Sequence, residues 1–449
     1  MSGSSPIKII VILLDGLGDR SYPILNHRTP LQAAETPNLD RLAAMGGSGL
    51  FHASTIGQCL PSEMAHYLLF GYDAEQFPGR GLLEAVGFGV PFNDVDVLSL
   101  AHLSCVTCEG GVPVLALSRK DVPWNEDELA TLYGALESFE LRGLRFRLRR
   151  TGHNDAILVM GPNASPHVSD SDPMTVGCAM ARVMPTFGNP EPEKAKNTAA
   201  ALNAYLSHCH RVLTAHPVNG RRKDAGLPMA NFLATQRSGQ RILQVPFEQR
   251  WGLKGMLIAS GAMYRGLAHE LGLDYTQVKD GPDPGNDLRE RIAWALADNA
   301  HDFFHVHTKT PDQAAHKGDP LLKRDVISSL DRGLDELVIA LETENDLLVA
   351  VTADHSTPSE STLIHSGEPV PVTLVGPNVR RDLMTAFDEI HAAQGCVGSL
   401  RGDELMRLLL NYADRSILLG HRLGPEEKPF FPHRYEPFLL KTPSEPESS

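Results

Sequence analysis

The 449-residue sequence lacks an apolar run long enough to cross a bilayer. Its early run "IIVILL" is much shorter than the roughly 20 residues that a spanning helix needs. The run also leads directly into Asp15 and lacks the small-residue cleavage site of an export signal. We interpret it as a buried strand, and we expect no membrane partner.

The sequence also lacks an excess of positive charge. Its formal net charge is -14 at pH 7, and its pI is about 5.7. A nucleic acid or an anionic membrane is therefore not an expected partner, although a local basic pocket can still bind a small anion. A small metabolite is the expected partner. The sequence does not indicate an oligomeric state.

Cysteine is scarce and scattered, with six residues in the chain. The close pair Cys105 and Cys108, in "CVTCEGG", has no second pair to complete a zinc site. Reduced thiols and a cytoplasmic location are therefore expected. The hydrophobic content of 42% is that of a globular chain with a substantial core.

Four near-continuous apolar runs end in polar or charged residues: "IKIIVILLD", "DFFHVHTK", "DLLVAVTADH" and "PVPVTLVGP". Such runs are typical of strands buried on both faces of a parallel sheet. Helical patterns such as "TPNLDRLAAMG" and "DVISSLDRGLDELVIALETE" lie between them. The pattern predicts a doubly wound α/β core.

The middle third of the chain has a different pattern. "VLSLAHLSCVTCEGGVPVLAL" and "LRFRLRRTGHNDAILVMG" resemble hairpins, and "EDELATLYGALESF" resembles a helix. We therefore predict an α+β domain, residues 93–227, inserted into a core made of residues 1–92 and 228–440. The polar ends, "MSGSSP" and residues 441–449, are expected to be unfolded.

The residues that close the apolar runs are candidate ligands, because ligands of open parallel sheets bind beyond the carboxyl ends of the strands. Asp15 closes the first run, and Asp354 and His355 close the third. In "TPDQAAH", Asp312 and His316 are one helical turn apart on the same face.

His365 follows in "IHSGEPVP". Alone, each of these residues is more simply interpreted as a capping or hydrogen-bonding group. Together, the three aspartates, three histidines and one serine form a mixed oxygen and nitrogen ligand set suited to two divalent ions, manganese, zinc or magnesium. Two such ions can activate a nucleophile and neutralise a transferring phosphoryl group.

Ser62, the serine of that set, heads the apolar run "SEMAHYLLFGYD". An isolated serine before a helix is usually a plain N-cap. Beside two metal ions, however, its hydroxyl becomes a nucleophile, and the helix N-terminus behind it can bind a phosphate. The residues alone leave both interpretations of Ser62 open, the N-cap and the nucleophile.

Several segments, in order along nearly the whole chain, resemble the archaeal-type cofactor-independent phosphoglycerate mutases of the alkaline phosphatase superfamily. They include "ILLDGLGDR", "PSEMAHYLLFGYD", "GRGLLEAVGFG", "HPVNGRRKDAGLP", "WGLKGMLIASGAMYRGLA", "TADHSTP" and "HSGEPVPV". The resemblance implies an alkaline-phosphatase-like core that carries an inserted domain. It also implies a glycolytic isomerase that interconverts 3-phosphoglycerate and 2-phosphoglycerate.

By this resemblance Ser62 would become a phosphoserine. One metal would be held by Ser62, Asp15, Asp354 and His355, and the other by Asp312, His316 and His365. Lys309, in "HTKTPD", matches a family lysine that could stabilise phosphoryl charge. A solvated lysine after a strand is the alternative interpretation of Lys309.

The segments that depart from the family pattern lie where substrate is expected to bind. "AHLSCV", "GHND" and "LATQRSGQ" lack residues that the family has, arginines among them. Arg150, His153, Arg221 and Arg222 are the candidates left to bind an anionic substrate. The alternative function is therefore a phosphatase or phosphotransferase of the same superfamily that acts on another phosphorylated or phosphonate metabolite.

Overall fold

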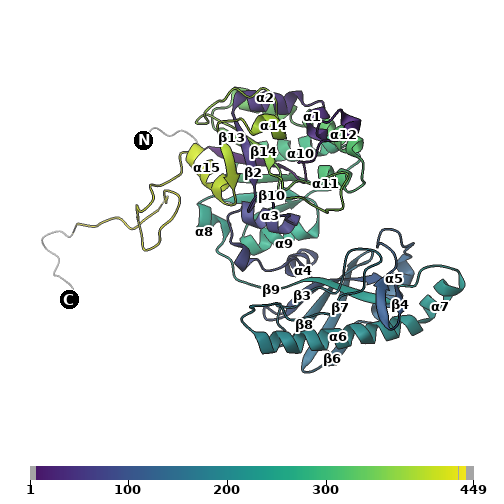
Figure 1. The fold of residues 1–449 in the computed structure, drawn as a ribbon. Coiled ribbons are helices and arrows are strands. Elements are labelled where there is room, and N and C mark those ends of the chain that lie inside the picture. Colours follow the sequence, from purple (N-terminus) through teal and green to yellow (C-terminus); the bar gives the residue numbers. More distant parts are fainter. Residues whose placement is uncertain (1–6, 433, 441–449) are drawn as a thin grey trace. The chain divides into compact units, whose positions relative to one another are not determined.

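The computed structural model describes residues 7–432 and 434–440. The two ends expected to be unfolded, residues 1–6 and 441–449, lie outside the described residues. The chain divides into two compact units (Figure 1). The first unit comprises Met1–Tyr72, Val245–Ser260 and Leu271–Ser449, and the second comprises Asp73–Gln244 and Gly261–Glu270.

The first unit is built on a mostly parallel sheet, which has eight strands among the described residues. In spatial order they are β11 (Asp274–Gln277), β10 (Gly255–Ala259), β12 (Phe303–Thr308), β1 (Lys8–Leu14), β13 (Leu347–Thr352), β14 (Val370–Val375), β2 (Gly47–His52) and β15 (Gly398–Arg401). The central strands β1, β12 and β13 are completely buried apart from Lys8 at the start of β1.

Helices of the first unit cover both faces of this sheet, as alternate residues of β12 show. Phe303 packs against Phe247 with a ring-centroid distance of 5.0 Å, and the adjacent Phe304 packs against Trp294 at 6.3 Å. Since adjacent strand residues point to opposite faces, the helices that carry Phe247 and Trp294 lie on opposite sides. The predicted doubly wound α/β core is therefore confirmed.

The described helices of this unit vary from one turn to nearly four turns. They are α1 (Pro30–Ala33), α2 (Pro37–Met45), α3 (Ser62–Leu69), α8 (Phe247–Trp251), α10 (Pro284–Ala297), α11 (Thr310–Ala315), α12 (Pro320–Arg332), α13 (Asp335–Thr343), α14 (Glu389–Ala392) and α15 (Glu404–Tyr412), with a 3-10 turn η1 (Pro23–Leu25). No helix in the described part of the chain is long and apolar enough to cross a membrane.

Strand β14 differs from the expectation of a parallel strand. It is antiparallel to both of its neighbours, β13 and β2. The connection from β13 to β14 contains no helix, so the chain turns back without the crossover that a parallel strand requires. As a result, the start of β14 lies at the edge of the sheet where β1, β12 and β13 end.

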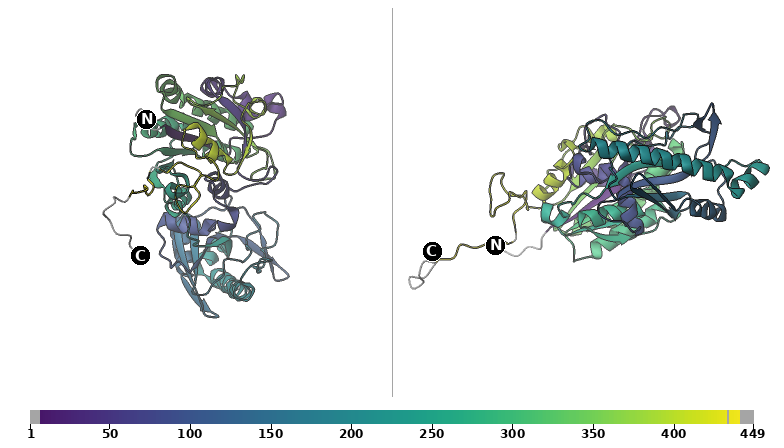
Figure 2. Two further views of the ribbon diagram at one scale, coloured as in Figure 1. Left: turned by 90° about the vertical axis from the view of Figure 1, so that its left-hand side faces the viewer. Right: turned by 90° about the horizontal axis from the view of Figure 1, so that it is seen from below.

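The second unit is an α+β structure around a sheet in which every pairing is antiparallel. Its strands, in spatial order, are β6 (Ser138–Leu141), β7 (Leu144–Gly152), β8 (Asp155–Gly161), β3 (Val97–Ser104) and β9 (Phe232–Gln240), with a separate hairpin of β4 (Val106–Glu109) and β5 (Val112–Leu115). The predicted hairpin β7–β8 is present, whereas the other hairpin consists of β4 and β5 alone. Figure 2 shows the long helix α6 (Pro192–Ala215) lying along this sheet.

The remaining helices of the second unit are α4 (Arg80–Phe88), α5 (Glu126–Gly134), α7 (Pro217–Asp224) and nearly all of α9 (Ala262–Leu271), with a 3-10 turn η2 (Ala74–Gln76). Helix α4 packs against β3 and β9. At Gly81 the approach is so close that a Cβ atom would collide with the carbonyl oxygen of Leu98. The first compact unit ends at Tyr72, whereas the predicted domain border lies at residue 92. The predicted domain borders themselves stay a prediction.

Candidate metal centre

The loop after β1 brings two ligand-bearing segments together. Gly16 has a φ of +66°, which glycine adopts without strain. A Cβ atom at Gly16 would lie 2.6 Å from Oγ1 of Thr357 and 2.8 Å from Cβ of Asp312. The loops that follow β1, β12 and β13 therefore pack in direct contact, with no space for a side chain at residue 16.

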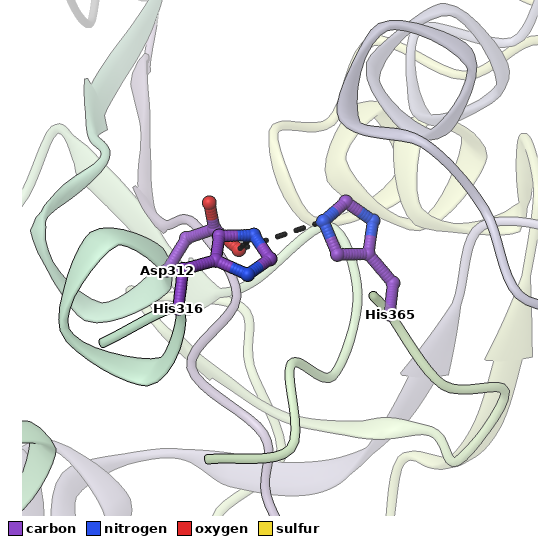
Figure 3. Close-up of side chains that lie close together, drawn as sticks. All are labelled: Asp312, His316 and His365. Atoms are coloured by element: carbon purple, nitrogen blue, oxygen red, sulfur yellow. Dashed lines mark ion pairs between the residues drawn. The ribbon is translucent and has the colours of Figure 1, made fainter. Parts of the chain in front are cut away.

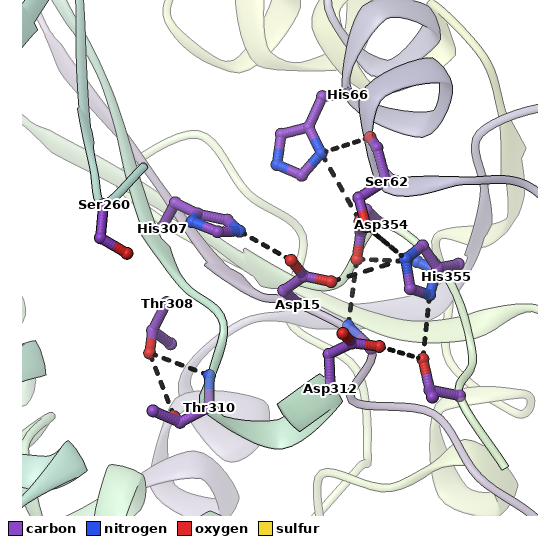
Figure 4. A network of polar contacts seen from close by, with 12 residues as sticks. Asp15, Ser62, His66, Ser260, His307, Thr308, Thr310, Asp312, Asp354 and His355 are labelled. Atoms are coloured by element: carbon purple, nitrogen blue, oxygen red, sulfur yellow. Dashed lines mark hydrogen bonds and ion pairs between the residues drawn. The ribbon is translucent and has the colours of Figure 1, made fainter. Parts of the chain in front are cut away.

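Asp15, Asp354 and His355 form the first ligand set, shown in Figure 4. Each offers an atom within 4.8 Å of the others, and all three side chains are buried. Nε2 of His355 lies 3.1 Å from Oδ2 of Asp354 and 3.5 Å from Oδ1 of Asp15. The backbone N–H groups of Gly16 and His355 donate to the other carboxylate oxygen of Asp354. The backbone thus orients Asp354 so that Oδ2 faces the cluster.

Asp312, His316 and His365 form the second set, shown in Figure 3. Oδ1 of Asp312 lies 3.2 Å from Nε2 of His316, one turn along α11, and 3.6 Å from Nε2 of His365. Nδ1 of His365 donates to the carbonyl of Leu60 at 2.7 Å, which leaves Nε2 as the ligand atom. His365 precedes β14, so the reversed direction of that strand brings it to this edge.

Ser62 is the first residue of α3, and Pro61 occupies the N-cap position. The helix start has no side-chain cap hydrogen bond, so the interpretation of Ser62 as a plain N-cap is wrong. Its Oγ lies 3.0 Å from Nε2 of His355 instead (Figure 4). The rings of His355 and His365 stack at 3.7 Å, so the two ligand sets adjoin each other beside Ser62.

The electrostatics of this centre fit a bound cation. Burial, and then the charge of Asp354, raises the pKa of Asp15 to about 7. Burial, and then the charge of Asp312, likewise raises the pKa of Asp354 to about 7. Oδ2 of Asp354 is buried and receives no hydrogen bond from the described residues. Carboxylates placed so close together in a dry site are stabilised by a divalent ion, and the oxygen and imidazole donors suit one.

The second set is electrostatically different. Burial alone would raise the pKa of Asp312, but a hydrogen bond and positive charge from His316 hold it below its usual range. Burial, and then the neighbouring His355, lowers the pKa of His365 to about 4. His365 is therefore neutral at pH 7, which is the state that binds metals.

Two buried histidines behind the first set were not predicted from the sequence. Nε2 of His307 lies 3.0 Å from Oδ2 of Asp15. Nδ1 of His66 donates to the carbonyl of Ser62 at 2.8 Å and lies 3.5 Å from Oδ2 of Asp354. The four-residue spacing of Ser62 and His66 indicates their closeness, whereas nothing in "HVHTK" singles out His307 until β12 is placed beside β1.

The other sequence candidates belong to neither ligand set. Lys309 is half-buried at the N-cap of α11, in the first unit. In the second unit, Arg150 and His153 both contact Glu126 of α5. Arg221 is exposed. The structure therefore brings together Ser62 and the six predicted metal ligands, and it pairs Arg150 with His153.

Arg222 is buried beside an acidic partner. Its guanidinium donates to Oε2 of Glu128 at 2.7 Å and to the carbonyls of Pro228 and Pro123 at 2.7 and 3.1 Å. All three guanidinium nitrogens are thus used within the second unit. These contacts explain the burial of Arg222 without a ligand.

A polar cavity of about 380 Å³ lies within the second unit and was not predicted from the sequence. Arg80, His102, Arg119, Lys120, Asp172 and Arg237 are among the residues that line it. Nε2 of His102 lies 3.4 Å from Oδ2 of Asp172, to which Gln236 also donates. Burial, and then the charge of Arg119, lowers the pKa of His102 to about 4. The lining also includes Glu84 and Asp155, which pair with Arg80 and Arg119, so its charge is mixed.

Comparisons with known proteins show the family of this chain. Residues 7–412 match the model of the metalloenzyme superfamily. A 2,3-bisphosphoglycerate-independent phosphoglycerate mutase of Methanocaldococcus jannaschii is 38% identical over 443 residues, covering 97% of this chain and 100% of the relative. A solved Pyrococcus horikoshii protein aligns with a TM-score of 0.73 and 26% identity over 93% of this chain and 100% of its own.

The solved cofactor-independent phosphoglycerate mutase of Thermoplasma acidophilum aligns with a TM-score of 0.60 and 30% identity. The alignment covers 91% of this chain and 100% of that one. The family resemblance inferred from the sequence motifs is thus confirmed over nearly the full length. The chain belongs to the metalloenzyme superfamily and, within it, to the archaeal-type 2,3-bisphosphoglycerate-independent phosphoglycerate mutases.

Proposed function

We propose that this chain interconverts 3-phosphoglycerate and 2-phosphoglycerate through a phosphoserine at Ser62. The observation that carries the proposal is the position of the Ser62 hydroxyl. It lies 3.0 Å from His355, at the first residue of a helix and beside both ligand sets. Relatives that align over nearly the full length and are named as phosphoglycerate mutases support the choice of substrate.

Members of the metalloenzyme superfamily depend on divalent metals, and for this chain we propose two ions, manganese, zinc or magnesium. Asp15, Asp354, His355 and Ser62 would hold one ion. Asp312, His316 and His365 would hold the other. When bound, such ions lower the pKa of a hydroxyl and neutralise phosphoryl charge.

The chemistry proposed for Ser62 is a double displacement. A bond forms between Oγ of Ser62 and phosphorus while the bond from phosphorus to the 3-oxygen breaks, and the proton that Ser62 loses is regained by the 3-hydroxyl of glycerate. In the second half the 2-hydroxyl of glycerate takes the phosphoryl group and the proton returns to Ser62. The amide groups at the start of α3 can bind phosphoryl oxygens, and Lys309 is the proposed further source of positive charge.

Binding of the substrate's other end is also a proposal. Arg150, His153, Arg221 and Arg222 stay predictions as substrate-binding residues. The polar cavity of the second unit is a further candidate, because Lys120 and His102 are among the residues that line it. The proposed location is the cytoplasm, where such a small phosphorylated metabolite is found.

Phosphorus NMR of the metal-loaded protein with 3-phosphoglycerate tests this function. We expect the 2-phosphoglycerate signal to grow in the wild type and in a Ser207→Ala control, whose side chain is exposed on α6. In Ser62→Ala the growth should fall by about 1,000-fold or more, as expected for the loss of a covalent nucleophile.

Inorganic phosphate in place of 2-phosphoglycerate would make the chain a phosphatase and overturn the mutase proposal. If the protein has both metals bound and 3-phosphoglycerate does not react, the site would be assigned to another phosphorylated or phosphonate metabolite. A Ser62→Ala variant as active as wild type would exclude the phosphoserine.

A further inference from the structure

Thr357 lies between the two ligand sets, and its backbone is held from both sides. Its side chain is fully buried. Its N–H donates to the carbonyl of Gly18 at 2.9 Å, and its carbonyl accepts from Nζ of Lys323 at 2.8 Å. The same Nζ donates to the carbonyl of Gly18 and pairs with Asp19. The loops after β1 and β13 are thereby joined, and the position of the threonine is fixed.

The hydroxyl of Thr357 contacts one member of each ligand set. Its Oγ1 lies 2.8 Å from Oδ1 of Asp312 and 3.2 Å from Nδ1 of His355. A hydroxyl has one proton, and an ionised carboxylate can only accept. The hydroxyl therefore donates to Asp312, so the proton in the second contact must come from Nδ1 of His355.

This count of protons determines the tautomer of His355. With its proton on Nδ1, the neutral ring presents an unprotonated Nε2. That nitrogen lies 3.0 Å from Ser62 and 3.1 Å from Asp354, inside the first ligand set (Figure 4). Neutral imidazole can bind a metal only through a nitrogen without a proton.

We propose that Thr357 is a positioning residue, which fixes the metal-binding tautomer of His355 and joins the two ligand sets through one hydroxyl. Asp312 polarises the hydroxyl, and the hydroxyl then accepts more strongly from His355. Outer partners of this kind orient ligands and typically contribute about 10- to 100-fold to metal affinity. The inference rests on the proposed function only in assigning the two sets to metals.

The first test needs no substitution at Thr357. In the Zn²⁺-loaded protein labelled with [15N]histidine, long-range proton–nitrogen NMR shows which imidazole nitrogen carries the proton. We expect the His355 signals, assigned by their absence in His355→Gln, to show the proton on Nδ1. A proton on Nε2 would overturn the proposal.

The second test compares Thr357→Val, which removes the hydroxyl at nearly constant shape, with Thr357→Ser, which retains it. Calorimetric titration of each folded protein with Zn²⁺ should show an affinity 10- to 100-fold lower in Thr357→Val. Thr357→Ser, and the matched control Thr343→Val on the exposed face of α13, should remain within about threefold of wild type. Equal affinity in Thr357→Val and Thr357→Ser would overturn the role of the hydroxyl.

Neither test uses phosphoglycerate, so the role of Thr357 and the proposed function can fail separately. A protein that binds Zn²⁺ with the expected tautomer but does not convert 3-phosphoglycerate would contradict the proposed function and leave the role of Thr357 supported. A protein that converts 3-phosphoglycerate with His355 protonated on Nε2 would support the function and exclude the role of Thr357.

Discussion

The two units organise their polar groups in opposite ways. In the first unit, residues from five separate chain segments meet at one edge of a sheet, where Asp15, Ser62, Asp312, Asp354 and His365 lie in or beside two adjoining ligand sets. In the second unit, Arg150 and Arg222 are paired with acids of their own unit, whereas Arg221 is exposed. The difference follows from strand direction.

Parallel strands all end at one edge, so polar residues that close successive strands converge there. In the antiparallel sheet of the second unit, successive strands end at opposite edges. The "GHND" turn between β7 and β8 lies beside the end of β3, where Asn154 accepts from the N–H of Leu103 and donates to its carbonyl. This polar side chain is therefore used in the unit's own hydrogen bonding. The cavity around His102 takes its polar lining from several elements of this unit, and no single sequence pattern indicates it.

The largest expected effect comes from Asp354→Asn in the first unit. The amide removes a ligand charge and the buried oxygen that faces the cluster. We expect the affinity for Mn²⁺, measured by calorimetry, to fall by more than the roughly 100-fold that outer partners contribute. The matched change in the second unit, Asp172→Asn, should leave the affinity for Mn²⁺ unchanged. Equal losses in both variants would remove the distinction between the units.

A smaller effect is expected from Arg222→Met in the second unit. Removing the guanidinium leaves Glu128 and two backbone carbonyls without their donor. We expect the free energy of unfolding to fall by about 3 kcal/mol in urea titrations, as for a broken buried ion pair. The adjacent, exposed Arg221→Met is the control. An increased KM at unchanged stability would instead support the predicted substrate-binding role of Arg222.

The smallest effect concerns pH. Burial lowers the pKa of His102 from 6.5 to about 4, so the unfolded state binds the extra proton first as pH falls. The folded state is then increasingly disfavoured between pH 6.5 and pH 4. His102→Gln should abolish about 2 kcal/mol of the stability difference between pH 7 and pH 4.5. The exposed control His27→Gln should retain it. Identical pH profiles for His102→Gln and wild type would show that His102 is not buried as a neutral ring.

The ligands that could be predicted from sequence share a simple property. Asp15, Asp354 and His355 directly follow buried strands, and Asp312 and His316 are linked by helical spacing, so local rules are sufficient to locate them. His365 is the exception, since it lies at this edge only because β14 runs antiparallel to its neighbours. The apolar pattern of β14 is equally compatible with a parallel and an antiparallel strand. The absence of a helix between β13 and β14 is the feature that indicates the antiparallel direction.

His307 and Thr357 contact the ligand residues, and neither could be predicted from the sequence. His307 reaches Asp15 only through the register of β12 beside β1, and Thr357 reaches Asp312 only because Gly16 leaves space for both. Such contacts join segments that are distant in the chain, and no periodicity encodes them. Strand-end residues determine which groups can form the centre, whereas packing between loops determines how those groups are oriented.

The fully buried ammonium of Lys323 has a consequence for the order of folding. It is tolerable in an apolar interior only when Asp19 and the carbonyls of Gly18 and Thr357 are all in place. These partners come from the two ends of the core sequence, before and after the inserted unit. We therefore expect this ammonium to stay in water in a partly folded chain, and the loops of the centre to close in one step. Hydrogen exchange at the amides of Gly18 and Thr357 with clearly different opening free energies would contradict this.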